Sequence, residues 1–238
     1  MHFAKKLCLN LLIFSPLSGM KTADVSQNVT QYIQKNLAEF GVSNASKFSV
    51  VLEEGTYVNM SVNSARTKFR ITKGAHDEIE QGIQRNGDSN KYRLIIAHEA
   101  RHLINQDDLK RAVSVGSSLW IVPTLLEKAK FYRNLNSSFA KFSLTASLVA
   151  LGPLLYSRHQ EWEADKFACT QAISKQELLN HKKHFEAFFG PDRQAFLKEY
   201  PITTRIFFNV FDPFHPYIGD RITYIEKQIQ NFDQKQNS

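Results

Sequence analysis

The sequence predicts a mainly α-helical fold with one small β-sheet, in the α+β class. Two patterns carry this prediction: apolar residues recur at helical spacing over most of the chain, and three short segments between residues 47 and 72 are rich in β-branched and aromatic side chains. With 238 residues, 42% hydrophobic and 22% charged, the composition fits one globular domain over residues 24–232. It excludes a disordered, collagen-like or coiled-coil chain.

The elements follow in order after residue 24. Val25–Phe40 has apolar residues at helical spacing and predicts one amphipathic helix. Three short strands are then predicted because turn residues separate the β-rich segments, which are Lys47–Leu52, Tyr57–Val62 and Lys68–Thr72. A second helix, from about Lys91 to Leu103, follows this small sheet and is expected to be buried.

The first 20 residues have the composition of a signal peptide. Lys5 and Lys6 precede an apolar run over Leu7–Leu17, and small residues follow it. Residues 1–20 therefore predict export, with an uncleaved N-terminal anchor as the alternative. Cys169 would then be the single cysteine of the mature chain, so no disulfide framework is expected.

The charge pattern bears on the partners of the protein. The formal net charge is +7 and the basic residues are spread along the whole chain, with no nucleic-acid-binding motif among them. We expect no nucleic-acid partner. A diffuse positive charge fits an anionic membrane surface, where each basic residue contributes on the order of 1 kcal/mol. Nothing in the sequence indicates an oligomeric state.

The second helix contains the most informative motif, His98-Glu99-Ala100-Arg101-His102, an H-E-x-x-H pattern. Residues four apart on a helix lie about 40° apart around its axis, so both imidazoles can reach one metal ion. Glu99 lies beside them, where it can hold a water molecule. The alternative is a pair of structural histidines on a core helix.

A zinc enzyme of this type needs a third protein ligand and an open fourth position. Glu161 and Asp165 are four residues apart and share one face of a predicted helix, whereas Glu163 lies on the opposite face. Glu161 can bind the metal while Asp165 orients a ligand histidine through its second ring nitrogen. We expect one Zn²⁺ per chain, held by His98, His102 and Glu161. The alternative is an acidic helix surface without a metal.

These motifs resemble those of the membrane-linked gluzincin peptidases, which include HtpX, the CAAX prenyl proteases, the Oma-type proteases and their periplasmic bacterial relatives. The resemblance covers about Phe48 to Ile225. It rests on the zinc helix and on five further elements: Tyr57-Val58-Asn59, Phe69 to Gly74, Asn105-Gln106-Asp107, Glu161 to Asp165, and His215-Pro216 with Arg221-Ile222. The sequence departs from many family members at Arg101, where Gly is usual, and at Met60-Ser61.

The resemblance implies a zincin-type domain that hydrolyses peptide bonds in protein or peptide substrates. Glu99 would be the general base that takes the proton of the attacking water and passes it to the leaving amine. The resemblance further implies that Asn59 belongs to the substrate-binding edge strand. His215 would be a reversible latch on the metal or a substrate-binding group, and a plain loop histidine is the alternative. Arg221 would bind the oxyanion or pair with a carboxylate such as Asp165.

Two apolar segments, Ala112–Leu126 and Phe142–Tyr156, predict a helical hairpin over residues 112–156. Each would reach about 22 Å, short of the roughly 30 Å hydrocarbon core, and Pro123 and Pro153 are expected to interrupt them. Basic residues between the segments fit either a peripheral hairpin or one that crosses to the cytoplasmic side: Lys128, Lys130, Arg133 and Lys141. We favour the peripheral form, in an exported periplasmic or membrane-associated zinc endopeptidase. An exported chaperone-like or protein-binding module with a structural or latched zinc site is the alternative function.

Overall fold

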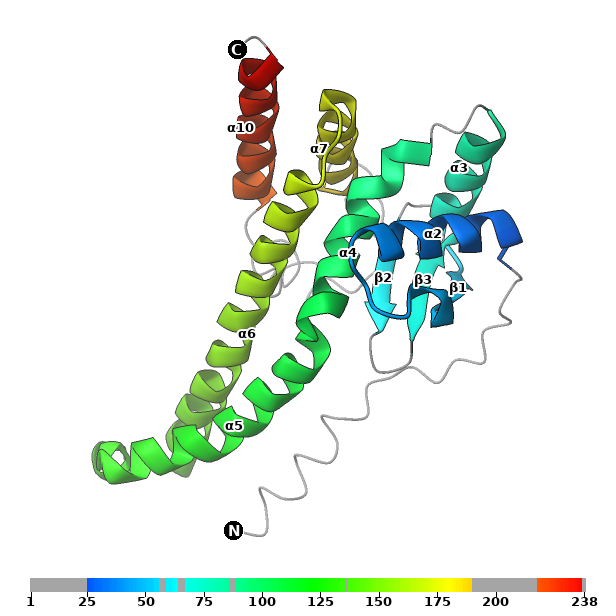
Figure 1. Cartoon of the computed structure of the whole chain (residues 1–238). Helices are drawn as coiled ribbons and strands as arrows, with labels where there is room; N and C mark the ends of the chain where they lie inside the picture. Colours follow the sequence, from blue (N-terminus) through cyan, green and yellow to red (C-terminus); the bar gives the residue numbers. More distant parts are fainter. Residues whose placement is uncertain are drawn as a thin grey trace.

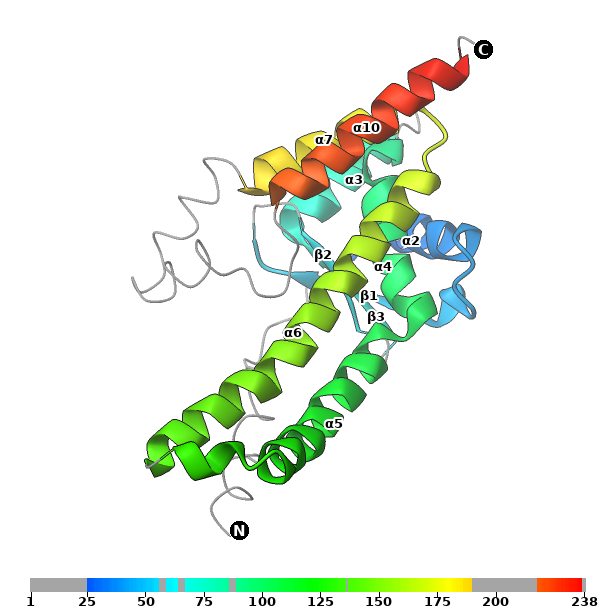
Figure 2. The same ribbon diagram turned by 90° about the vertical axis from the view of Figure 1, so that its left-hand side faces the viewer.

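The computed structural model describes residues 25–55, 59–63, 67–85, 89–135, 137–189 and 218–236. Helix α2 packs against α3 and α4, all three helices contact a small three-stranded sheet, and α5 and α6 project from this body as a long antiparallel pair (Figures 1 and 2). The predicted α+β fold is confirmed. The predicted leader, residues 1–20, lies outside the described residues.

Helix α2 (Gln27–Glu39) is the first described element. Ser26 caps it, because its hydroxyl oxygen accepts a hydrogen bond from the backbone N–H of Val29 at 3.3 Å. Val29, Ile33 and Leu37 lie on one face and are fully buried. Burial of each such side chain is worth about 1.5–3 kcal/mol, so this face holds α2 against the rest of the domain.

The sheet consists of β1 (Ser49–Glu53), β2 (Met60–Asn63) and β3 (Lys68–Thr72), in the order β1-β3-β2. The central strand β3 pairs with β1 in parallel and with β2 in antiparallel orientation. β2 therefore lies at an edge of the sheet. It begins at Met60, and Tyr57 and Val58 of the predicted strand lie outside the described residues.

Helix α3 (Lys73–Gln84) and the short η3 (Ser89–Tyr92) lead into α4 (Arg93–Asn105). Most of the apolar side chains of α4 are buried, as its sequence predicts. They are Leu94, Ile95, Ile96, Ala97, Ala100 and Leu103. The helix ends at Asn105, and the next residue, Gln106, has a left-handed backbone with φ of 54°. This residue turns the chain so sharply that the next helix begins at the following residue.

Helices α5 (Asp107–Lys128) and α6 (Ser138–Thr170) form the projecting pair, joined through η4 (Phe131–Asn134). Pro123 and Pro153 lie inside these helices, so the expectation that they interrupt the apolar segments was wrong. A proline removes one helical hydrogen bond, but the turns on both sides keep theirs and the helix continues. With 33 residues, α6 reaches about 50 Å, far longer than its apolar segment alone.

The last two described helices are α7 (Lys175–Phe189) and α10 (Ile218–Gln236), which pack on each other beside the C-terminal end of α6. Ile225 of α10 and Leu178 of α7 are fully buried between the elements. This packing brings α7 and α10 next to the part of α6 that carries Glu161. Residues from α4, α6, α7 and α10 therefore meet in one place.

Candidate active site

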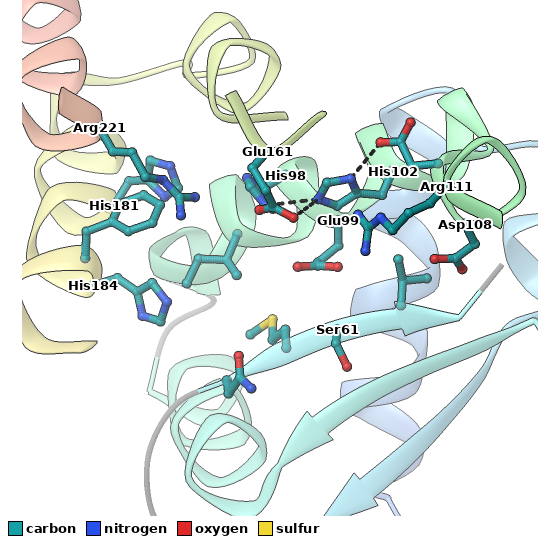
Figure 3. A pocket seen from close by; sticks show the side chains of 16 residues that line it. Ser61, His98, Glu99, His102, Asp108, Arg111, Glu161, His181, His184 and Arg221 are labelled. Carbon is teal, nitrogen blue, oxygen red and sulfur yellow. Dashed lines mark hydrogen bonds and ion pairs between the residues drawn. The ribbon is translucent and has the colours of Figure 1, made fainter. Parts of the chain in front are cut away.

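Three potential metal ligands converge where α4 and α6 pack together (Figure 3). Nε2 of His98 lies 3.2 Å from Nε2 of His102 and 3.2 Å from Oε2 of Glu161. Nε2 of His102 lies 3.5 Å from Oε1 of Glu161. Two neighbouring turns of α4 thus present both imidazoles to one carboxylate.

The spacing of these atoms fits a single zinc ion. For ligand bonds of about 2.1 Å, the corners of a tetrahedron are about 3.4 Å apart, and the three separations fall close to this value. Two imidazoles and one carboxylate are also a ligand set that zinc prefers in catalytic sites. The residues present therefore fit zinc, with the fourth corner left for water or substrate.

Asp165 extends the cluster behind His98. Its Oδ1 lies 3.0 Å from Nδ1 of His98, on the far side of the ring from the proposed metal position. Arg221 of α10 donates two hydrogen bonds of 2.6 Å to Asp165, from Nε and Nη2. The contact with His98 places Asp165 where it could orient this histidine. Arg221 adopts the carboxylate pairing that was one of its two predicted roles.

The charged groups around His98 and Asp165 shift the pKa values of these two side chains. Burial alone would lower the pKa of His98, but the Asp165 and Glu161 carboxylates outweigh burial and raise it to about 10 in the metal-free protein. Burial alone would raise the pKa of Asp165, but the Arg221 guanidinium and His98 outweigh burial and hold it below its usual range. Asp165 therefore stays ionised, and a metal at the cluster would displace the His98 proton.

Asp107 supports the second histidine in the same way, and the sequence reasoning missed this role. Its Oδ2 lies 2.8 Å from Nδ1 of His102, and the side chain is buried. The left-handed backbone of Gln106 ends α4 and starts α5 in a new direction, which leaves Asp107 within reach of His102. The signal in the sequence was an acidic residue directly after the zinc helix.

The cluster opens into a pocket of about 340 Å³ between α4 and the edge strand β2. The side chain of Glu99 points into this pocket, where it lies between the cluster and the strand (Figure 3). Asn59 and Ser61 line the opposite wall. One edge of β2 faces no other described strand, so an extended peptide could pair with it.

Further residues that the sequence analysis did not single out line the two ends of the pocket. His181 and His184 of α7 lie at one end, and Asp108 and Arg111 of α5 lie at the other (Figure 3). Arg111 donates a hydrogen bond of 3.3 Å from Nε to Gln160 of α6. No motif marks these residues, because their positions depend on how α5 and α7 pack.

The structure also bears on the alternative interpretations of the motifs. Glu161 and Asp165 are buried, so the interpretation of their segment as an acidic surface is wrong. Glu163 lies outside the cluster and pairs with Lys166 at 2.9 Å. The nitrogens of His98 face acidic groups and His102 instead of apolar core. His215 lies outside the described residues, and its predicted role stays a prediction.

Taken together, a small sheet with an open edge strand, a buried helix with two converging histidines, and a carboxylate from a later helix are typical of zincin-type metallopeptidases. The family model described as Peptidase family M48 matches residues 25–229, which is most of the chain. The protein therefore belongs to this family of zinc metallopeptidases, as the resemblance to HtpX, the CAAX prenyl proteases and the Oma-type proteases implied. Neither an individual curated protein nor a solved structure matches the chain significantly.

Proposed function

We propose that the protein is an exported zinc endopeptidase of the gluzincin type, which hydrolyses peptide bonds of proteins at or near a membrane. The observation that carries this proposal is the position of Glu99 in one pocket with His98, His102 and Glu161, facing the open edge of β2. A general base, a metal cluster and a strand edge for an extended peptide are the three parts that metal-assisted peptide hydrolysis needs.

His98, His102 and Glu161 would hold the zinc ion. When bound there, zinc lowers the pKa of water toward 7 and polarises the carbonyl of the peptide bond. Glu99 accepts the proton of the attacking water and returns it to the leaving nitrogen. Asp165 and Asp107 hold the two imidazoles in the orientation that keeps both Nε2 atoms toward the metal position.

The edge strand β2 would hold the substrate. Asn59 lines the pocket at the start of this strand, in agreement with the role that the resemblance implies. Arg221 also lines the pocket, but two of its nitrogens bind Asp165. We therefore assign Arg221 to the support of Asp165 and His98, with contact to the oxyanion through its remaining Nη1 as a second role.

The exposed surface of α5 and α6 supports a location at a membrane. Large apolar side chains cover this surface, with Trp120 81% exposed and Phe139 76% exposed. Lys128, Lys130 and Lys141 lie around the tip of the pair, where they can contact anionic headgroups.

We propose that this hairpin lies on the membrane rather than across it. Both ends of the hairpin connect to the same active site, so a crossing would require two spanning helices. Among the helices that the structure describes, α6 alone is long and apolar enough to span a bilayer, and α5 is not. A hairpin that lies on the membrane surface needs no spanning helix, so it agrees with the composition of both α5 and α6. The leader-like composition of residues 1–20 supports export.

The test compares the wild type with Glu99→Gln, using zinc content and cleavage of casein as readouts. Glu99→Gln should keep zinc and fold but lose activity by about 10²- to 10⁴-fold, because an amide cannot accept the proton of the water. Glu163→Gln on the neighbouring helix is the matched control and should cleave as the wild type does. If zinc-loaded wild type and Glu99→Gln were equally inactive on casein and on peptides, the alternative of a chaperone-like or protein-binding module with a structural or latched zinc site would replace this proposal.

A further inference from the structure

His181 of α7 is a buried imidazole that lacks a hydrogen-bond partner among the residues that the structure describes. Its side chain is 1% exposed, and neither Nδ1 nor Nε2 is paired there. Its ring packs edge-on against Phe185 at 4.8 Å between centroids. An unpaired buried polar group destabilises a protein, so a position that keeps one indicates a ligand that pairs with it.

His184 lies one turn further along α7 and lines the same pocket (Figure 3). Residues three apart on a helix share one face, so both imidazoles face the end of the pocket beside α7. Burial lowers the pKa of His181 to about 3 and that of His184 to about 4. Both rings are therefore neutral at physiological pH, and each carries one N–H donor and one acceptor nitrogen.

A neutral donor and acceptor on one ring match the groups of a peptide backbone, which offers an N–H and a carbonyl at each residue. Two neutral imidazole rings offer no charge to pair with an ionised side chain of a substrate. Arg221, which also lines the pocket from α10, has its charge paired to Asp165. The end of the pocket beside α7 is thus suited to an uncharged polar ligand.

The direction of β2 shows which side of a substrate would lie there. β2 runs from the end of the pocket that holds His184 toward the end that holds Asp108 and Arg111 (Figure 3). An antiparallel pair is the more stable arrangement for a strand added to this edge. The substrate would then run from Asp108 toward His184, so the residues after the cleaved bond would lie against α7.

We propose that His181 and His184 form the subsite for the leaving side of the substrate, where they exchange hydrogen bonds with the backbone of the first residues after the cleaved bond. This inference rests on the proposed function, since it needs a peptide in the pocket. It adds two substrate-binding residues and a direction of binding to the mechanism. The two histidines position the peptide and do not take part in proton transfer.

The first experiment measures kcat/KM on a quenched-fluorescence peptide that spans a casein cleavage site. His184→Ala should lower kcat/KM by about tenfold, as expected for the loss of one or two hydrogen bonds to the substrate, and His184→Asn should recover part of it. His159, an exposed histidine of α6 outside the pocket, supplies the control, and His159→Ala should change nothing. If His184→Ala stayed within twofold of the wild type, the subsite would be excluded.

Truncated peptides test the direction. The effect of His184→Ala should disappear when the peptide is shortened on its leaving side and should persist when it is shortened on the other side. The opposite pattern would overturn the assignment. Binding of the labelled peptide to Glu99→Gln, with and without His184→Ala, separates this inference from the proposed function. If the wild type cleaves nothing, the proposed function fails, whereas weaker binding after His184→Ala would still support the subsite.

The stability of the zinc-free protein tests His181. Leucine is close to histidine in volume, so His181→Leu should leave the melting temperature unchanged or raise it, because it removes an unpaired polar group. The same variant should weaken peptide binding in the Glu99→Gln background. A melting temperature that falls by several degrees, with peptide binding unchanged in the folded fraction, would make His181 a structural residue and overturn its assignment.

Discussion

Arg221 on α10 holds Asp165 on α6 through two hydrogen bonds of 2.6 Å, and both side chains are buried. Oδ1 of this carboxylate, which accepts one of the two bonds, also lies 3.0 Å from Nδ1 of His98, a proposed zinc ligand. The C-terminal helix is thus tied to the metal cluster through one aspartate. Three helices that are far apart in the sequence depend on each other at this point.

The three proposed ligands should be necessary for zinc binding. Replacing any one of them by alanine, as in His98→Ala, His102→Ala or Glu161→Ala, should remove most of the bound metal, because two ligands hold zinc weakly. Metal analysis of the purified proteins measures this, with Glu163→Ala as the control on the same helix. Full zinc occupancy in Glu161→Ala would place the third ligand elsewhere.

The two aspartates behind the histidines should differ in their effects. Asp107→Asn should lower zinc affinity by about 10- to 100-fold with little loss of stability. Asp165→Asn should lower the affinity similarly and also destabilise the fold by about 3–5 kcal/mol, because it leaves the buried Arg221 charge unpaired. Zinc titration and urea unfolding measure the two effects. Asp220→Asn, an exposed position on α10, is the control, and equal unfolding curves for both aspartate variants would contradict this prediction.

The stability of the zinc-free protein should fall at alkaline pH. The pKa of His98 in the folded state is about 10, above its ordinary value of 6.5, so the bound proton stabilises the fold fully below about pH 6.5. This contribution is lost as the pH rises toward 10. Urea unfolding at about pH 6 and about pH 9.5 tests it. The zinc-loaded protein should not show this loss of stability, because zinc replaces the His98 proton. A zinc-free protein that became more stable between the two pH values would contradict the raised pKa of His98.

The left-handed residue between α4 and α5 offers a stabilising substitution. Gln106 has φ of 54°, which costs a residue with a Cβ atom about 1–2 kcal/mol. Gln106→Gly should remove this cost. Glycine also makes the unfolded chain more flexible, which opposes folding, so the net gain in stability should be about 0.5–1 kcal/mol. Thermal unfolding measures it. Gln106→Ala keeps the Cβ atom and should show no gain, so equal gains in both variants would reject the explanation.

The membrane proposal has its own test. If α5 and α6 rest on lipid, alkaline carbonate should release the mature protein from membranes, since no helix pair crosses the bilayer. Trp120→Ser on the exposed face should weaken binding to vesicles that contain anionic lipid, without loss of zinc. Retention of the mature protein in the carbonate pellet would instead favour a spanning hairpin with Lys128 and Lys130 on the cytoplasmic side.

The sequence by itself determined the parts that depend on local spacing. A helix brings residues four apart to one face, so the pairing of His98 with His102 could be predicted from the motif. The fold class followed from the periodicity of the apolar residues for the same reason. The resemblance in turn supplied Asn59, Arg221 and His215, of which the first two line the pocket and the third lies outside the described residues.

Only the tertiary structure decided the parts that depend on packing between distant elements. Asp107 reaches His102 because α4 ends at one left-handed residue and α5 begins directly after it, and backbone conformation at a single Gln has no sequence signal. His181 reaches the pocket because α7 packs beside α4, across about 80 residues of sequence. Contacts of this kind arise when whole helix faces become buried against each other, and local residue patterns do not encode that packing. They complete a site whose metal ligands the sequence had already indicated.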